Sequence, residues 1–462
     1  MVNHGGCTRS IGRYAGWCST TCTGLLLSEC RLGRDGGTLR LCGTVTQCLP
    51  FVCSELQVRD PFRAAHIKHI TVQPVSFLNT YLIYPRFFGK REELRCQPAS
   101  MMKRLIEPFS TPTSARDHLP ALQSLRVECS KHWNFIHHYI PFTNTYKPFL
   151  RNAILSIVTN LRSLILNIPL EAYWDTLDLN LHFPNLEHFE FTVYIMYFTT
   201  DHGKILGEVL APFVNRHTTL TSLSILFDDV VSWMRISYAF DFPALFRSLT
   251  HLPCLSTLHV RLYLTGPKQT DLSGLCQFLQ QNTGTLRTLT LHLMTNLHFG
   301  YRDTGFNDLS PYIMHTPYTP HTLFAEKLFT ETIPALTALR SFFLECLQED
   351  TIRSSIKTFK PVLQWFAANP QFAARLERLA FPGYLVEGRE LGTLFETVSF
   401  GGLRTVDFRV ARVDVRLLDI MEMNVPGLEK LTITASEYVG RESGNDSVRL
   451  HIFSDRSPAN TT

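Results

Sequence analysis

The chain has no strong excess of charge of either sign. Its 462 residues include 44 Lys and Arg against 40 Asp and Glu, which leaves a formal net charge of +4. Proteins dedicated to nucleic-acid binding concentrate positive charge on one face or along one helix. A balance this even argues against that class, and we expect no nucleic-acid partner.

Long apolar runs are also missing. No stretch approaches the ~20 apolar residues that a membrane-spanning helix needs. The beginning, Met1-Val2-Asn3-His4, lacks the charged start and apolar core of a signal peptide. We therefore expect no membrane association and a cytoplasmic or nuclear location. Hydrophobic residues still make up 45% of the chain, enough to bury a large core.

The sequence contains none of the common catalytic signatures. It has no Gly-x4-Gly-Lys-Ser/Thr phosphate loop, no His-Glu-x-x-His helix and no Gly-x-Ser-x-Gly turn. The adjacent pair His137 and His138 is a poor metal site, because neighbouring side chains point to different sides of a strand or helix. We expect a protein that is not an enzyme, with no catalytic residues, no metal and no cofactor.

The cysteines do not form a recognisable site. Seven of the twelve fall in the first 53 residues, where Cys18/Cys22 and Cys48/Cys53 are the only close pairs. Structural zinc sites need two such pairs at tighter spacing, or one pair followed by a histidine pair. Residues 1–60 are rich in Cys, Gly and Thr and are predicted to be a poorly ordered leader. Residues 454–462 are predicted to be a disordered tail.

From residue 61 to 453 one pattern recurs: an apolar residue, two others, an apolar residue, one other and an apolar residue. The last two apolar positions are two apart, so both point to one face of a short strand. Eleven copies occur in order, which excludes chance in a Leu-rich chain. Their first apolar residues are Ile67, Leu122, Leu161, Leu186, Leu220, Leu255, Leu286, Leu339, Leu376, Leu403 and Leu428.

Segments with helical periodicity lie between these strands. Apolar residues recur at helical spacing in five of them, and Asp201 is a candidate N-cap for the first. The five ranges are 201–217, 241–252, 271–282, 388–398 and 413–423. A single strand–helix unit cannot bury its apolar face, so neighbouring units must stack. The pattern predicts an α/β solenoid with parallel strands on the concave face and helices and irregular segments outside.

These units resemble leucine-rich repeats (Leu-x-x-Leu-x-Leu) and are similar to the irregular repeats of fungal F-box proteins. Phrases such as Asn160-Leu161-Arg162-Ser163-Leu164 carry the resemblance, which covers roughly residues 60–453. Unit spacing varies from 25 to 55 residues, and no regular asparagine follows the last apolar position. Both features favour the irregular, helix-backed subclass.

The resemblance implies a substrate receptor of an SCF-type ubiquitin ligase, whose F-box binds the adaptor Skp1. Only Leu49-Pro50 echoes the start of an F-box, and residues 1–48 contain no amphipathic helix of the expected length. No F-box is recognisable, which counts against Skp1 as a partner. A stand-alone repeat scaffold unrelated to ubiquitin transfer is therefore the alternative hypothesis.

The residues that alternate with the buried strand positions should line the concave face. Basic, acidic and aromatic side chains are mixed there, and most remaining positions are Ser or Thr. Such a surface suits a protein or peptide ligand better than a phosphate backbone. The candidate ligand-binding residues are Arg126, Glu128, His188, Glu190, His259, Arg261, His292, Phe343, Glu345, Arg378, Asp407, Arg409 and Lys430.

Two long insertions interrupt the repeats. We expect loops near 73–118 and 295–335, the second lying in the 53-residue interval from Leu286 to Leu339. Pro and Tyr are dense in the second loop, and long loops in compact domains are often functional. Its candidate contact residues are Tyr301, Tyr312 and Tyr318. The leading hypothesis is a non-enzymatic protein-recognition module.

Overall fold

The structure of the 462-residue chain is a computed structural model. The structure describes residues 38–41, 68–72, 121–128, 160–177, 181–194, 202–227, 242–264, 271–296, 320–348, 360–413, 415–438 and 448–453. The predicted loop 73–118 lies outside the described residues, and so do the candidate contact residues Tyr301, Tyr312 and Tyr318. The tail 454–462 and the candidate N-cap Asp201 also lie outside them.

Thirteen described strands form one sheet in sequence order, with each strand hydrogen-bonded to the next. Strands β1 to β12 pair in parallel, and β13 pairs with β12 in the antiparallel sense. The strands are β1 Thr38–Leu41, β2 His69–Val72, β3 Ser124–Glu128, β4 Ser163–Pro169, β5 His188–Tyr194, β6 Ser222–Phe227, β7 Thr257–Tyr263, β8 Thr288–Asn296, β9 Ser341–Gln348, β10 Arg378–Val386, β11 Thr405–Val413, β12 Lys430–Tyr438 and β13 Val448–Phe453.

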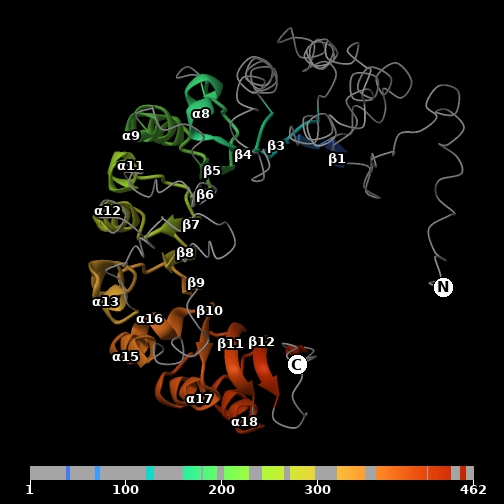
Figure 1. Ribbon diagram of the computed structural model, residues 1–462, viewed down its shortest axis with the longest axis vertical. Coiled ribbons are helices and arrows are strands. Elements are labelled where there is room, and N and C mark those ends of the chain that lie inside the picture. The colour runs from blue at the N-terminus through green and yellow to red at the C-terminus, as the bar shows by residue number, and fades with distance from the viewer. Residues whose placement is uncertain are drawn as a thin grey trace, which may run out of the picture.

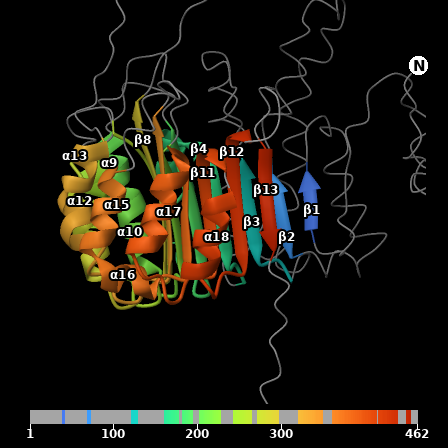
Figure 2. The same ribbon diagram turned by 90° about the horizontal axis from the view of Figure 1, so that it is seen from below.

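The eleven predicted strands are confirmed as β2 to β12. The strands curve in an arc, and the helices lie on its outer side (Figures 1 and 2). The chain is therefore an α/β leucine-rich-repeat solenoid, with an inner concave sheet and a helical outer layer. Within the described residues, no helix is both long and apolar enough to cross a membrane.

The outer layer contains the five helical segments that the sequence predicts. The first combines two α-helices with a π-helical turn between them. In order they are α9 His202–Ile205, η6 Leu206–Leu210, α10 Ala211–Arg216, α11 Phe242–Ser248, α12 Ser273–Gln281, α17 Gly388–Thr397 and α18 Val415–Asn424. Helices α11 and α12 approach closely at Gly274, where an added Cβ would lie 2.4 Å from the carbonyl oxygen of Pro243. Only glycine permits that approach.

Other elements were not predicted. These are strands β1 and β13 and the helical segments α8 Leu170–Thr176, α13 Pro320–Ala325, η8 Leu328–Thr332, α15 Lys360–Ala368 and α16 Pro370–Arg375. Strand β1 lies inside the expected leader, where Thr38–Leu41 pair with β2. Segments α13 and η8 lie inside the expected loop 295–335. They are ordered because Leu323, Leu328 and Phe329 are buried in the same core as the strands.

The core is continuous along the solenoid. Buried apolar residues from Leu122 to Ala435 form a single cluster. In β7 the pattern is regular: Leu258, Val260 and Leu262 are buried, while the residues between them are partly exposed. This alternation places every second strand residue on the concave face.

Candidate ligand-binding surface

The parallel register arranges the concave-face residues in rows that cross the strands. Three rows matter here, and we call them the first, second and third rows. The first row holds Ser124, Ser163, His188, Ser222, Thr257, Thr288, Ser341, Arg378, Thr405 and Lys430. The second holds Arg126, Ile165, Glu190, Ser224, His259, Thr290, Phe343, Ala380, Asp407 and Thr432. The third holds Glu128, Asn167, Thr192, Leu226, Arg261, His292 and Glu345.

The structure places all thirteen candidate residues on these strands. Twelve belong to the three rows, and Arg409 pairs with Thr434 further along β11. They are not equally close to one another. His188, Arg378 and Lys430 lie apart along the first row, whereas the residues on β7, β8 and β9 form one group.

That group, which we call the central cluster, consists of His259, Arg261, His292, Phe343 and Glu345. The ring of His292 lies between two others, with its centroid 4.8 Å from that of His259 and 5.1 Å from that of Phe343. Its Nδ1 is hydrogen-bonded to Oε2 of Glu345. The imidazole is therefore held between two aromatic neighbours and a carboxylate.

Histidine 259 is neutral and has an unused polar atom. Burial lowers its pKa to about 4, and the nearby His292 and Arg261 act in the same direction. Its Nε2 atom is buried without a hydrogen-bond partner in the described part of the chain. Buried polar groups nearly always have a partner, so this unpaired nitrogen is an exception within the cluster.

The pKa values of two carboxyl groups on this surface are shifted in opposite directions. The hydrogen bond from His292 lowers the pKa of Glu345, although burial opposes the shift. Burial raises the pKa of Glu190, against the charge of Arg126. Glu345 therefore carries a firmly held negative charge beside the basic Arg261, whereas Glu190 is easier to protonate.

The arrangement can recognise polar and aromatic groups. It combines a guanidinium, a carboxylate, a neutral imidazole and the partly exposed Phe343 within three strands. Mixed polar and aromatic surfaces of this kind are typical of protein interfaces. Among the residues that the structure describes, no three His, Cys, Asp or Glu side chains are grouped so that they could hold a metal ion.

Sequence reasoning missed several residues of the concave face. Ile165 and Leu226 occupy positions in the second and third rows, and Leu226 is only 9% exposed. Asn167 in the third row has a buried Oδ1 with no hydrogen-bond partner in the described structure. The alternation of each strand identifies these positions, although the apolar Ile165 and Leu226 are not among the candidate residues.

The sequence also predicts no regular side-chain ladder between turns. The structure has inter-turn hydrogen bonds at a different position, after the outer helices. His217 Nε2 accepts from the backbone N–H of Phe183 at 3.0 Å, and Asn282 Oδ1 accepts from that of Leu252 at 3.1 Å. These buried side chains join each turn to the preceding one, so their role is structural.

Comparisons with known proteins add little. No model of a protein family matches the chain, and no curated protein sequence matches it. One similar solved structure is the crystal structure of the Rad7 and Elc1 complex in yeast. It is 13% identical, covers 82% of this chain and 75% of that one, and has a TM-score of 0.32. A likeness of this size carries no functional argument. The chain's own sheet, register and outer helices identify it as a leucine-rich-repeat solenoid.

Proposed function

We propose that the chain is a non-enzymatic recognition module that binds a protein or peptide ligand on its concave face. The observation that carries this proposal is the central cluster. In it, a neutral imidazole with an unpaired buried nitrogen lies beside Arg261, the His292–Glu345 pair and an aromatic ring. A ligand that presents an acidic group to Arg261 and an apolar or aromatic group to Phe343 would complement it.

As the finer form of the proposal, the module selects substrates for an SCF-type ubiquitin ligase. The irregular, helix-backed repeats support this form, and the lack of a recognisable F-box counts against it. The alternative is a stand-alone scaffold that binds its partner without Skp1. Both forms use the same concave face, so they differ in what accompanies the ligand.

The experiment is affinity purification of the full-length chain from its own cells, followed by mass spectrometry. It compares wild type with Arg261→Glu and Arg409→Glu. Arg389→Glu is the matched control, because Arg389 is an exposed arginine on the outer helix α17. We expect Arg261→Glu to lose the partner, Arg409→Glu to weaken its recovery and the control to retain it.

The outcomes separate the hypotheses. Equal recovery by wild type and both concave-face variants would contradict recognition through this surface. Skp1 and a cullin in the wild-type eluate would support the ubiquitin-ligase form. A different protein in stoichiometric amount, without Skp1, would favour the scaffold.

A further inference from the structure

At the ends where the strands begin, the sheet carries a regular row of side chains that crosses the strands, and we call it the edge row. Each member directly precedes a strand, and its backbone N–H donates to the carbonyl of the preceding member. Typical distances are 2.8 Å from Arg340 N to Arg287 O and 2.7 Å from Glu377 N to Arg340 O. Adjacent members are therefore held at the spacing of neighbouring strands. The row consists of Lys68, Gln123, Arg162, Glu187, Thr221, Ser256, Arg287, Arg340, Glu377, Arg404 and Glu429.

Most charges in the edge row are matched by a neighbour of opposite sign. Arg162 Nη1 lies 3.3 Å from Glu187 Oε1, and Arg404 Nη1 lies 2.8 Å from Glu429 Oε1. Arg340 Nε lies 3.9 Å from Glu377 Oε1. These three pairs show the arrangement that the row favours.

Arg287 breaks this arrangement. Its neighbours in the row are the uncharged Ser256 and the basic Arg340, whose acidic partner is Glu377. In the part of the chain that the structure describes, Arg287 has no ion-pair partner. Like charges on adjacent strands are destabilising, so the row is left with an uncompensated positive charge at β8.

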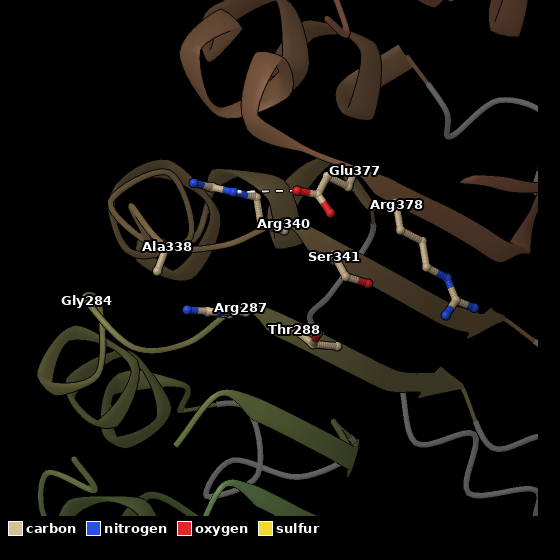
Figure 3. Close-up of a pocket in the computed structure, with 8 residues that line it drawn as sticks. All are labelled: Gly284, Arg287, Thr288, Ala338, Arg340, Ser341, Glu377 and Arg378. Carbon is tan, nitrogen blue, oxygen red and sulfur yellow. Dashed lines mark ion pairs between the residues drawn. The ribbon is translucent and has the colours of Figure 1, made fainter. Parts of the chain in front are cut away.

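A pocket of about 560 Å³ lies at this break in the pairing. It is lined by Arg287, Arg340, Glu377, Arg378, Thr288 and Ser341, among others (Figure 3). Three arginines and one glutamate therefore line the pocket. Arg378 belongs to the first row of the concave face and also has no ion-pair partner among the described residues. In Figure 3, Arg340 faces Glu377. Arg287 extends to the same side of the strands as Arg340, whereas Arg378 extends to the opposite side, beside Ser341.

We infer that this pocket binds an anionic group, a carboxylate or a phosphoryl group, of the protein ligand. Guanidinium forks bind both groups through paired hydrogen bonds, and the hydroxyls of Thr288 and Ser341 add donors. An anion bound beside these hydroxyls would neutralise Arg378, which has no ion-pair partner among the described residues, and the positive charge of Arg287 would add to the attraction. The inference rests on the proposed function, because Arg378, Thr288 and Ser341 connect the pocket to the concave face.

The pocket suits one discrete anion rather than a nucleic-acid backbone. A phosphodiester strand requires a continuous positive track. Along the edge row, Glu377 and Glu429 alternate with the arginines on one side, and Thr221 and Ser256 are neutral on the other. The local positive charge therefore ends on both sides of the pocket.

The test measures the melting temperature of the full chain with increasing inorganic phosphate or glutarate, at constant ionic strength maintained with chloride. A ligand that binds only the folded state raises the melting temperature in a saturable way. We expect both anions to do so for wild type and for Arg389→Gln. In Arg287→Gln/Arg378→Gln, we expect affinity for both anions to fall about tenfold or more, since charge-assisted hydrogen bonds are lost.

A stronger response to phosphate would indicate a phosphorylated residue in the ligand, and an equal or stronger response to glutarate an acidic side chain. Equal responses of wild type and the double variant, or none beyond that to chloride, would overturn the inference. Arg261→Glu separates this result from the proposed function. It should retain anion binding while it loses the protein partner. If wild type does not bind the anions while partner capture still depends on Arg261, the inference about the pocket is refuted and the proposed function is not.

Discussion

The two faces of strand β7 differ in composition and role, although their residues alternate along the same strand. One face packs into the core, and the other lines the concave surface. Leu258 and Val260 are fully buried, and their neighbours in β6 and β8 are again leucine or isoleucine. His259 and Arg261 face the concave side, where the aligned residues change from strand to strand. On the buried face the same apolar residue types recur from strand to strand, because the apolar face of each unit must be buried against its neighbours. The other face is free to vary, since few of its residues support the stack.

The edge row also contains a regular part and an irregular part. Its outer pairs, such as Arg404 with Glu429, repeat the same complementary scheme, whereas β8 and β9 bring two arginines together. The variable features thus concentrate on β7, β8 and β9, where the central cluster and the pocket also lie. Regular packing marks the scaffold, and local departures from regularity mark the candidate binding surface.

The largest effect is expected from a charge on the buried face of β7. Leu258→Asp places an unpaired carboxylate in the continuous core. We expect the free energy of unfolding to fall by about 4 kcal/mol or more, with cooperative loss of neighbouring repeats. Urea denaturation followed by circular dichroism measures this. Thr257→Asp, one residue away on the concave face, should change stability by less than about 1 kcal/mol. Similar losses in both variants would contradict the division of faces.

The folded state should lose stability at acid pH because of the buried His217. Burial lowers its pKa to about 4 from 6.5. The unfolded imidazole binds a proton first as pH falls, so stability is lost between pH 6.5 and 4. The loss is at most about 3 kcal/mol for this group. The measurement is melting temperature against pH, and His217→Gln should flatten the curve without changing partner binding. His259→Gln should flatten it too but weaken the partner. A variant curve parallel to wild type would exclude His217 as a cause.

The concave face should tolerate a smaller change. Glu345→Gln replaces the carboxylate that His292 contacts with a weaker acceptor. We expect a stability loss of about 1 kcal/mol, because one charge-assisted hydrogen bond is weakened. The free energy of partner binding should fall by more than the free energy of unfolding. Binding of the captured partner measures the first quantity, and urea denaturation measures the second. Unchanged affinity would remove Glu345 from the recognition surface.

The smallest effects should come from the edge row. Arg404 and Glu429 are 63% and 62% exposed, so Arg404→Gln should cost about 0.5 kcal/mol or less. Arg287→Gln should be neutral or slightly stabilising, because it removes the like-charged neighbour of Arg340. Thermal melts at low salt can compare the two. Destabilisation by Arg287→Gln greater than that by Arg404→Gln would show that Arg287 supports the fold.

Sequence periodicity predicted the repeated elements well but not the irregular ones. The spacing of Leu255, Leu258 and Val260 indicates a strand entered from a turn, and that pattern recurs in each of β2 to β12. Strand β13 is not predicted, because Val448–Phe453 alternates without the preceding apolar residue of the repeat. It also pairs in the antiparallel sense. Helix α13 and segment η8 were hidden by the Pro and Tyr content around them. Their order depends on burial of Leu323 and Phe329 against the core.

The candidate site was only partly predictable for a related reason. Alternation within a strand identifies Arg261, His292 and Glu345 as concave residues. Their grouping depends on the register between strands that are 31 and 53 residues apart in the sequence. The same register brings Arg287 beside Arg340, a contact that no local pattern contains.

Local periodicity was enough to predict the repeating unit, the parallel solenoid and which face of each strand is buried. These follow from local periodicity, because a strand with apolar residues at every second position has one face that must leave water. Which polar residues become neighbours depends on how the strands align in the folded chain. This alignment set the partners of His292 and Arg340, left Arg287 unmatched and isolated the Nε2 atom of His259. Those relations depend on how insertions of unequal length bring distant strands into register.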